Sequence, residues 1–275
     1  MFVDPSLAHR LEQHEALYAR RIADAFAAAD PACGATFVRV GGATAAWVAR
    51  GSVLSKVHAL GLDGPVADDE LERIEDFYRT CGETRVTIEL SPFAGVDLAA
   101  RLEQRGYRMA GLEQVQVRPL AAVDARPVAT LPPGVTIEPV DPADHATRAA
   151  WVRVSTAGFF APAPSPPDIV RYSELCFDVL GTTAFLARVD GEPAAAGAHA
   201  IADGIAAFFA GSTVPAFRRR GSHAALIAAR IQAASAAGAA LATVGARPGG
   251  ASHRHLEAAG FAVGYTRPSF VRAWP

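Results

Sequence analysis

The same short pattern closes each half of the chain. Residues 102–107 read LEQRGY and residues 256–261 read LEAAGF, so Leu-Glu-x-x-Gly-aromatic recurs 154 residues later, from Leu102 to Leu256. Val117-Arg118 returns at the same spacing as Val271-Arg272. An internal repeat indicates two copies of one structural unit, which constrains the fold more than any single motif does. The length of 275 residues allows two ordinary domains.

The order of the expected elements supports this duplication. Three apolar strands of the second half are separated by Asp-Gly pairs, which suit two-residue hairpin turns. The elements expected there are strands over 181–189, 192–202 and 205–214, a helix over 218–237, a strand over 240–246, a helix over 251–259 and a strand pair from 261. The first half repeats the order from residue 37 to 118. We therefore predict an α/β fold with a mixed sheet in each of two tandem domains.

Residues 119–133 separate the two copies. This stretch is rich in Pro and Ala and has no sustained hydrophobic periodicity, as expected of a linker. We predict a first domain over residues 1–118 and a second over 134–275. Ahead of the strands, helical periodicity predicts helices over 5–29 in the first domain and over 141–157 and 166–177 in the second.

The composition narrows the class of protein. Hydrophobic residues make up 51% and charged residues 20%, which is typical of a globular protein, and the net charge of −2 provides no broad basic surface for nucleic acid. The three cysteines are far apart and form no Cys-x-x-Cys pair, so we expect neither a disulfide framework nor a metal site. The N-terminal residues contain no signal-peptide core or membrane span. We expect a cytoplasmic protein without membrane partners.

One turn in the second half points to chemistry. Residues 214–226, VPAFRRRGSHAAL, join the third strand to the long helix. Gly221 lets the backbone approach a ligand closely, and the free N–H groups of the first helical turn favour an anion. Arg218, Arg219 and Arg220 add positive charge. The pattern predicts a pyrophosphate cradle, while a solvated basic helix start and an unrelated phosphate or nucleic-acid contact stay open.

This junction resembles the signature of the GCN5-related N-acetyltransferase (GNAT) superfamily. The family pattern, (Arg or Gln)-x-x-Gly-x-(Gly or Ala), is met by Arg218-x-x-Gly221, and His223 stands where the family usually has Gly or Ala. The preceding strands and the closing Gly260-Phe261 also lie at the family's usual places, so the resemblance covers residues 134–275. It implies that acetyl-coenzyme A is the cosubstrate.

The resemblance also implies which residues hold that cosubstrate. Backbone N–H groups of residues 219–224 would bind the pyrophosphate, the end of the preceding strand would pair with the pantetheine amides, and a bulge at Gly211 would receive the thioester. The residues expected to bind coenzyme A are Gly211, Ser212, Thr213, Val214, Arg218, Arg219, Arg220, Gly221, Ser222, His223, Ala224 and Ser252.

The catalytic groups are harder to assign. Many family members have an Asn and a general-acid Tyr near the last helix, and alignment on Gly260-Phe261 puts Gly249 and Leu256 at those positions. His255 and Tyr265 are the nearby titratable candidates to replace the Tyr. The first half has no basic Gly turn and has an acidic helix start instead, which predicts a degenerate GNAT-like domain that serves as a scaffold or as a wall of the acceptor site.

We therefore expect an N-acetyltransferase that moves acetyl from acetyl-coenzyme A to an amine by direct attack in a ternary complex. The alternative is a non-catalytic coenzyme A-binding or protein-interaction module. The acceptor is expected to be a small-molecule or peptide amine, and either a monomer or a homodimer is compatible with the sequence. Phe159-Phe160, beside a Pro-rich loop, are candidates for the acceptor pocket or for a hydrophobic loop anchor.

Overall fold

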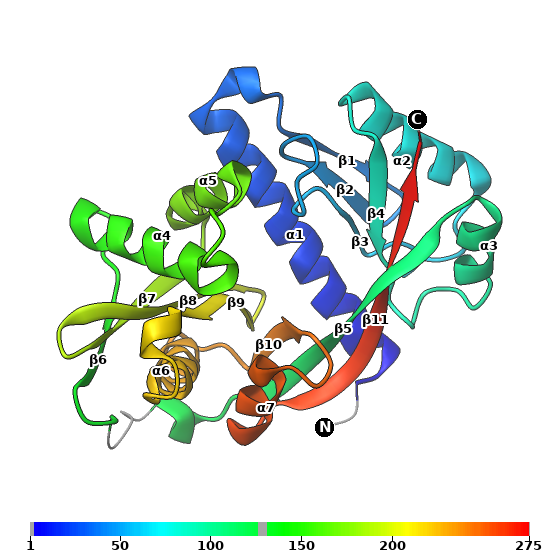
Figure 1. Ribbon diagram of the computed structural model, residues 1–275. Helices are drawn as coiled ribbons and strands as arrows, with labels where there is room; N and C mark the ends of the chain where they lie inside the picture. Colours follow the sequence, from blue (N-terminus) through cyan, green and yellow to red (C-terminus); the bar gives the residue numbers. More distant parts are fainter. Residues whose placement is uncertain (1–2, 126–130, 275) are drawn as a thin grey trace. The chain divides into compact units, whose positions relative to one another are not determined.

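A computed structural model describes residues 3–125 and 131–274 of the chain (Figure 1). The chain divides into two compact units. We call Phe2–Val115 with Val263–Pro275 the N-terminal unit, and Gln116–Ala262 the C-terminal unit. None of the helices in the described ranges is both long enough and apolar enough to cross a membrane.

The described part of the N-terminal unit has mixed strands and three α-helices. Its elements are α1 (Pro5–Ala29), a short 3-10 helix (Pro31–Cys33), β1 (Thr36–Val40), β2 (Ala43–Trp47), β3 (Val57–His58), α2 (Asp68–Thr80), β4 (Arg85–Glu89), α3 (Leu98–Gln104), β5 (Arg108–Pro119) and β11 (Ala262–Ala273). The strand order is β1-β2-β3-β4-β11-β5. Leu71, Ile74 and Tyr78 of α2 pack with Val86 and Ile88 of β4 in the core.

The C-terminal unit has mixed strands with helices on both faces. Its elements are a 3-10 turn (Ala122–Ala125), β6 (Val135–Pro139), α4 (His145–Phe160), α5 (Pro167–Leu175), a 3-10 turn (Cys176–Asp178), β7 (Thr182–Val189), β8 (Glu192–Ala202), β9 (Ile205–Thr213), a 3-10 turn (Pro215–Phe217), α6 (Ser222–Ala236), β10 (Leu241–Ala246) and α7 (Ala251–Ala258). In the spatial order of the strands, β5 is the neighbour of β10, and the order continues as β5-β10-β9-β8-β7-β6.

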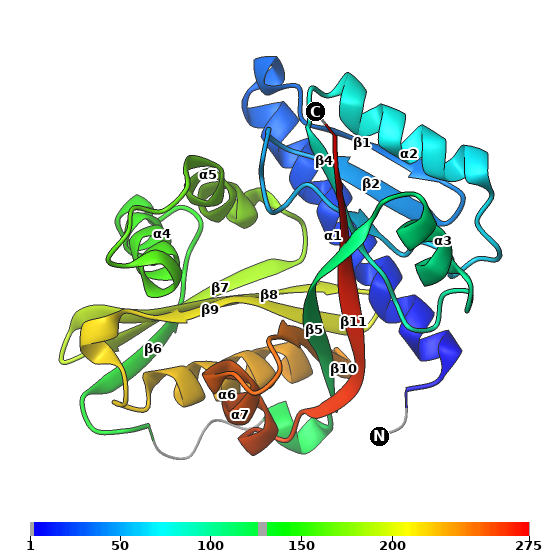
Figure 2. The same ribbon diagram turned by 45° about the vertical axis from the view of Figure 1, so that its right-hand side comes forward.

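Alternation along the strands separates the two faces of this sheet. On β7, Leu186 packs into the α4 side of the core, while Phe185 and Ala187 pack with Leu226 of α6. Figure 2 shows α4 and α5 on one side of β7, β8 and β9, and α6 on the other. The strand ends that carry the candidate site therefore lie between two helical layers.

The duplicated order of elements is confirmed. Three strands, a helix, a strand, a helix and a closing strand occur as β1 to β5 and again as β7 to β11. Most helix bounds agree closely with the sequence prediction, and α1 is an example, because Asp4 caps it through the N–H of Leu7 and a proline occupies its first turn.

The closing strand of the second half differs from its prediction. The sequence placed a strand pair after residue 261 in the second domain, whereas the structure has the single strand β11, which pairs antiparallel with β4 from Ser269↔Glu89 to Ala273↔Arg85. The described residues from Val263 to Trp274 belong to the N-terminal unit. Because the two halves repeat one plan, the apolar pattern of a closing strand cannot specify which of the two units it joins.

The predicted linker is in part ordered structure. Strand β5 runs to Pro119, the Leu120 N–H donates to the Ala240 carbonyl oxygen at 2.9 Å, and Leu120 packs against the core under α6. Arg118 forms an ion pair with Asp124 at 2.7 Å. Residues 126–130 of the predicted linker lie outside the described residues.

Candidate functional site

Strands β9 and β10 separate at a bulge. Their parallel pairing ends at Val244↔Phe208, although β9 continues to Thr213 and β10 to Ala246. On the other side of β9, the register with β8 shifts between Ala196 and Ala198, and Ala210 has a φ of 52°. An extra residue in one strand bends it and ends its pairing. The bulge predicted at Gly211 is present, and β9 and β10 are no longer paired at this point.

The turn that follows β9 is shaped for an anion. Arg219 has a φ of 65° and Gly221 a φ of 81°, whereas Arg220 between them is not left-handed. Residues of alternating handedness direct successive backbone N–H groups toward one point, which is an anion-binding arrangement. Helix α6 begins at Ser222 without a side-chain cap, so the N–H groups of its first turn are available to a ligand.

A cavity of about 500 Å³ lies at this turn. Every residue predicted to bind coenzyme A lines it except Val214 and Arg220. His255 also lines the cavity, together with three residues that were not in that prediction: Gly158, Phe159 and Ala251. The turn, the bulge and the start of α7 are therefore brought together at one site.

The two predicted residues outside the lining have other partners. The N–H of Val214 donates to the Ala194 carbonyl oxygen at 3.0 Å, and its side chain packs beside the core under α4. Arg220 donates to the Asp190 carboxylate at 2.7 Å. The side chain of Arg220 is thus neutralised, and only its backbone belongs to the turn.

The cavity is electropositive. Arg218 is held by the carbonyl oxygens of Thr213 at 3.4 Å and Gly158 at 3.2 Å, whereas the exposed Arg219 has no hydrogen bond or ion pair to the described residues. No carboxylate is among the described lining residues. The positive end of the α6 dipole adds to these charges. A ligand with phosphate groups fits this environment, and a cationic group does not.

Polar groups also line the strand side of the cavity. The Ser212 hydroxyl donates to the Val154 carbonyl oxygen at 3.0 Å, so that residue ties β9 to α4. The Thr213 hydroxyl oxygen is buried and has no partner among the described residues. A buried polar atom without a partner costs free energy unless a ligand satisfies it, so Thr213 fits a ligand with amide groups along β9.

Sequence reasoning missed Gly158. A Cβ there would lie 2.6 Å from the Ser212 Cβ and 2.9 Å from the Thr213 backbone nitrogen, so only glycine lets α4 approach β9 this closely. The available signal was a glycine within a helical pattern, which usually has a packing reason. Phe159, one of the two aromatic residues named as candidates for an acceptor pocket or a loop anchor, lines the cavity, and Phe160 is not among the described lining residues.

The two candidate catalytic residues have different surroundings. His255 lines the cavity, but Tyr265 belongs to the N-terminal unit and its hydroxyl donates to the Glu12 carboxylate at 2.6 Å. Burial, with the Glu12 charge and hydrogen bond, raises the pKa of Tyr265, which keeps its proton in place. Leu256, at the position of the family's Tyr, is buried in the core.

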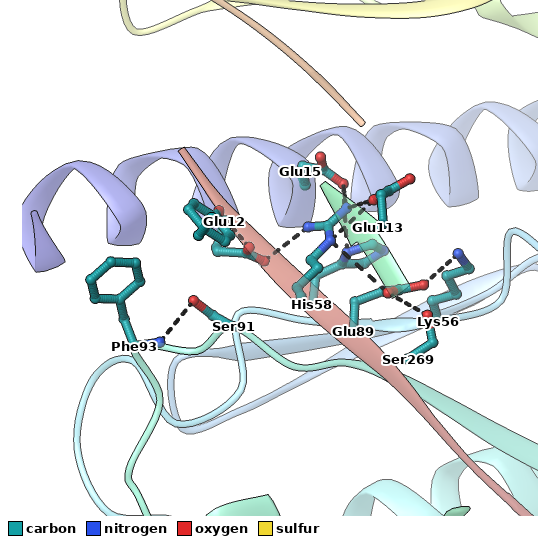
Figure 3. A network of polar contacts seen from close by, with 11 residues as sticks. Glu12, Glu15, Lys56, His58, Glu89, Ser91, Phe93, Glu113 and Ser269 are labelled. Carbon is teal, nitrogen blue, oxygen red and sulfur yellow. Dashed lines mark hydrogen bonds and ion pairs between the residues drawn. The ribbon is translucent and has the colours of Figure 1, made fainter. Parts of the chain in front are cut away.

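A buried ionic network surrounds Glu12 in the N-terminal unit (Figure 3). Arg267 lies 3.1 Å from Glu12, 2.9 Å from Glu15 and 2.6 Å from Glu113. Lys56, just before β3, pairs with Glu89 of β4 at 2.6 Å. Of these groups, Glu12, Glu89 and Arg267 are buried. Lys56 and Glu89 belong to the region of the parallel strands β3 and β4, the counterparts of β9 and β10.

Among the described residues of the N-terminal unit, the start of the helix that corresponds to α6 does not suit an anion. Helix α2, the counterpart of α6, begins with Asp68, Asp69 and Glu70. Three carboxyl groups at a helix start repel phosphate, and Glu70 already caps the N–H of Ala67 at 2.9 Å. Nowhere in the described ranges do three or more His, Cys, Asp or Glu side chains form a group that could hold a metal ion.

Solved structures share this architecture. A GCN5-related N-acetyltransferase from Kribbella flavida is 23% identical, covers 94% of this chain and 96% of its own length, and superposes with a TM-score of 0.63. A tandem GNAT protein from the clavulanic acid biosynthesis pathway is 14% identical over 84% of this chain and 74% of its own, with a TM-score of 0.57. The chain has a tandem GNAT fold.

Another GCN5-related N-acetyltransferase, from Sphaerobacter thermophilus, is similar to this tandem GNAT fold with a TM-score of 0.54. It is 16% identical over 74% of this chain and 65% of its own. No family model and no curated protein matches the sequence. At these identities the similarity establishes the fold, and the chemistry has to be argued from the site.

Proposed function

We propose that this tandem GNAT chain is an N-acetyltransferase that binds acetyl-coenzyme A in the cavity of the C-terminal unit. The observation that supports this most is the position of the cavity. It joins an anion-binding turn, at Arg219 to Gly221, to the point where β9 and β10 separate. A ligand with a pyrophosphate and an extended amide chain matches both features.

The acyl transfer needs few groups from the protein. The turn and the first N–H groups of α6 hold the pyrophosphate, and the exposed edge of β9 pairs with the pantetheine amides. The thioester then lies beside Gly211, where a backbone N–H stabilises the tetrahedral oxyanion that forms when an amine attacks. The carbon–nitrogen bond forms, the carbon–sulfur bond breaks, and coenzyme A leaves as its thiol.

The acceptor is a small-molecule or peptide amine. Because the described lining of the cavity contains no carboxylate, the cavity does not attract a protonated amine. The acceptor therefore reacts as the neutral amine, which is also the form whose nitrogen lone pair attacks a thioester.

A non-catalytic coenzyme A-binding module is the second candidate. The buried Leu256 is the observation that favours it, because the family's general acid is missing at that position. Release of free thiol from acetyl-coenzyme A with a panel of amines separates the two candidates. A product formed above the uncatalysed rate supports the transferase, and binding without turnover on any amine supports the module.

Ala224→Glu tests the cavity in either case. Ala224 is exposed in the first turn of α6, so a glutamate there should preserve or improve the helix while placing negative charge in the cavity. Ala224→Gln is the matched control of similar shape without charge. We expect the Glu variant alone to lose acetyl-coenzyme A binding at an unchanged melting temperature, and equal binding by both variants would reject the site.

A further inference from the structure

Two histidines meet inside the cavity, from two different helices. His223 lies in the first turn of α6 and His255 near the end of α7, and both line the cavity. Their ring centroids are 5.1 Å apart with an angle of 49° between the planes. The rings are therefore close enough to influence each other's protonation.

His223 lies beside the bulge. Its Cε1 atom is 3.6 Å from the point where a Cβ on Gly211 would lie, so the ring reaches the place where β9 leaves β10. The ring is half-buried, and neither of its nitrogens forms a hydrogen bond to the described residues. Both nitrogens are thus free to exchange a proton with a bound ligand.

The buried guanidinium of Arg230 also lies close to Gly211. Arg230 of α6 is 3% exposed, and one of its terminal nitrogens is 3.5 Å from the Cβ position of Gly211. Its hydrogen bonds go only to the carbonyl oxygens of Leu226, Ala198 and Phe209, at 3.3 to 3.4 Å, and no carboxylate pairs with it among the described residues. The guanidinium also lies 4.7 Å from the Phe208 ring centroid.

The groups around the His223 ring keep it neutral. Burial, then Arg230 and then His255, lowers the pKa of His223 to about 4. The other charged groups that line the same cavity are Arg218 and Arg219, which are also positive. No carboxylate in the described lining is available to stabilise an imidazolium. A proton that His223 accepts is therefore released quickly to a stronger base.

We propose, on the basis of the acyl-transfer function above, that His223 is the catalytic residue that carries the amine proton to the departing sulfur. The attacking nitrogen forms its bond to the acyl carbon and gives one proton to a free ring nitrogen of His223. The carbon–sulfur bond breaks with its electron pair on sulfur, and the imidazolium donates that proton to the thiolate. The neutral ring is restored, and the products are an amide and coenzyme A thiol.

Arg230 and His255 are positioning residues in this proposal. Arg230 occupies the space that Gly197 and Gly211 leave open and holds the carbonyl oxygen of Phe209 next to the bulge. It makes the imidazolium acidic without contacting the ligand, because it is not among the described lining residues. His255, which is exposed, lies against His223 with its ring tilted and limits where the His223 ring can turn.

The first test is His223→Asn, with His145→Asn as the control at an exposed histidine of α4. We expect the His223 variant to lower kcat by about 100-fold or more while the Kd for acetyl-coenzyme A, measured by calorimetry, stays within about threefold. Unchanged kcat with tighter binding would mean that the ring only obstructs the cavity, and would overturn the proposal. If the wild-type protein itself does not bind acetyl-coenzyme A, the proposed function is rejected instead.

The second test follows the protonation of His223 directly by NMR and then compares it with the pH profile of kcat. The imidazole resonances of His223, followed by NMR in the ligand-free protein, should titrate with a pKa well below 6.5 in the wild type and in Arg230→Lys, and higher in Arg230→Met. The acidic limb of the kcat profile should move upward in the Met variant only. A wild-type pKa near 6.5, or no change on removing the Arg230 charge, would contradict the proposal.

Discussion

Arg220 donates a hydrogen bond to the Asp190 carboxylate at 2.7 Å, while its neighbour Arg219 has no ionic partner among the described residues. Two adjacent arginines of one turn therefore differ in what they offer to a ligand. Arg219 lines the cavity, and its positive charge is available to a ligand. The guanidinium of Arg220 binds Asp190 and does not line the cavity.

This difference gives a matched pair of variants. Arg219→Ala should weaken acetyl-coenzyme A binding about tenfold, because it removes a charge-assisted contact to phosphate, whereas Arg220→Ala should change the Kd less than about twofold. Calorimetry at low and high salt measures both. The gap between the variants should narrow as salt rises, since exposed charges are screened. A larger effect at Arg220 would contradict the assignment.

The unpartnered hydroxyl of Thr213 provides a second prediction. Thr213→Val keeps the shape and removes a buried oxygen that has no partner in the described residues. We expect the melting temperature to stay equal or rise, and the Kd for acetyl-coenzyme A to increase about threefold to tenfold, as for one lost hydrogen bond. Unchanged binding would mean that the ligand does not use this strand.

The close approach of α4 to β9 depends on Gly158. Gly158→Ala places a Cβ 2.6 Å from the Ser212 Cβ, so the helix or the strand end must move. We expect a loss of about 1–3 kcal/mol in the free energy of unfolding and weaker acetyl-coenzyme A binding. Gly111→Ala is the control, because nothing lies within 4 Å of its Cβ position and its φ is not left-handed. Equal urea midpoints for the two variants would oppose this account.

A buried histidine should make stability depend on pH. Burial and then Arg230 lower the pKa of His199 to about 4, and its Nδ1 atom has no hydrogen-bond partner among the described residues. The unfolded chain takes up this proton near pH 6.5 and the folded chain only near 4, so the stability is full above 6.5 and decreases as pH falls through this window.

The variant that checks this is His199→Phe, which keeps an aromatic ring between Phe185 and Phe208. Its free energy of unfolding should fall by about 2 kcal/mol less than that of the wild type between pH 7 and pH 5. Urea titrations at the two pH values measure the difference. Parallel losses in the two proteins would show that His199 is not responsible.

The ionic network of the N-terminal unit should be essential for its stability. Arg267→Met leaves the buried Glu12 without its cation and should cost about 3–5 kcal/mol at neutral pH. The control is Arg188→Met, which breaks a partly exposed pair with Glu138 and should cost less than about 1 kcal/mol. Chemical denaturation measures the free energy of unfolding of both variants. Equally small losses of stability in the two variants would contradict the prediction for Arg267.

The sequence predicts the local parts of this molecule well. The bulge at Gly211, the turn at Gly221 and the start of α1 each depend on residues within one or two turns of chain, and glycine, proline and capping side chains identify them. The order of the elements follows from hydrophobic periodicity and hairpin turns in the same way.

Long-range relations are where sequence reasoning fails. No nearby sequence signal shows that β11 pairs with β4 or that the Tyr265 hydroxyl donates to Glu12. Nor does one show that position 158 must be glycine to leave room for Ser212. Arg230 left a weak signal, because it is a charged residue one helical turn from the buried Leu226 and Ile227. Its role depends on two glycines of separate strands, Gly197 and Gly211, which only the folded sheet brings together.

The assignment of the cavity can be decided by calorimetric titration of the full chain with acetyl-coenzyme A. We predict saturable binding with one site per chain, abolished by Ala224→Glu and retained by Ala224→Gln. ATP should bind far more weakly, because it has phosphates but no pantetheine to pair with β9. Two sites per chain would contradict the account of the acidic N-terminal unit, and no binding would contradict the assignment of the cavity.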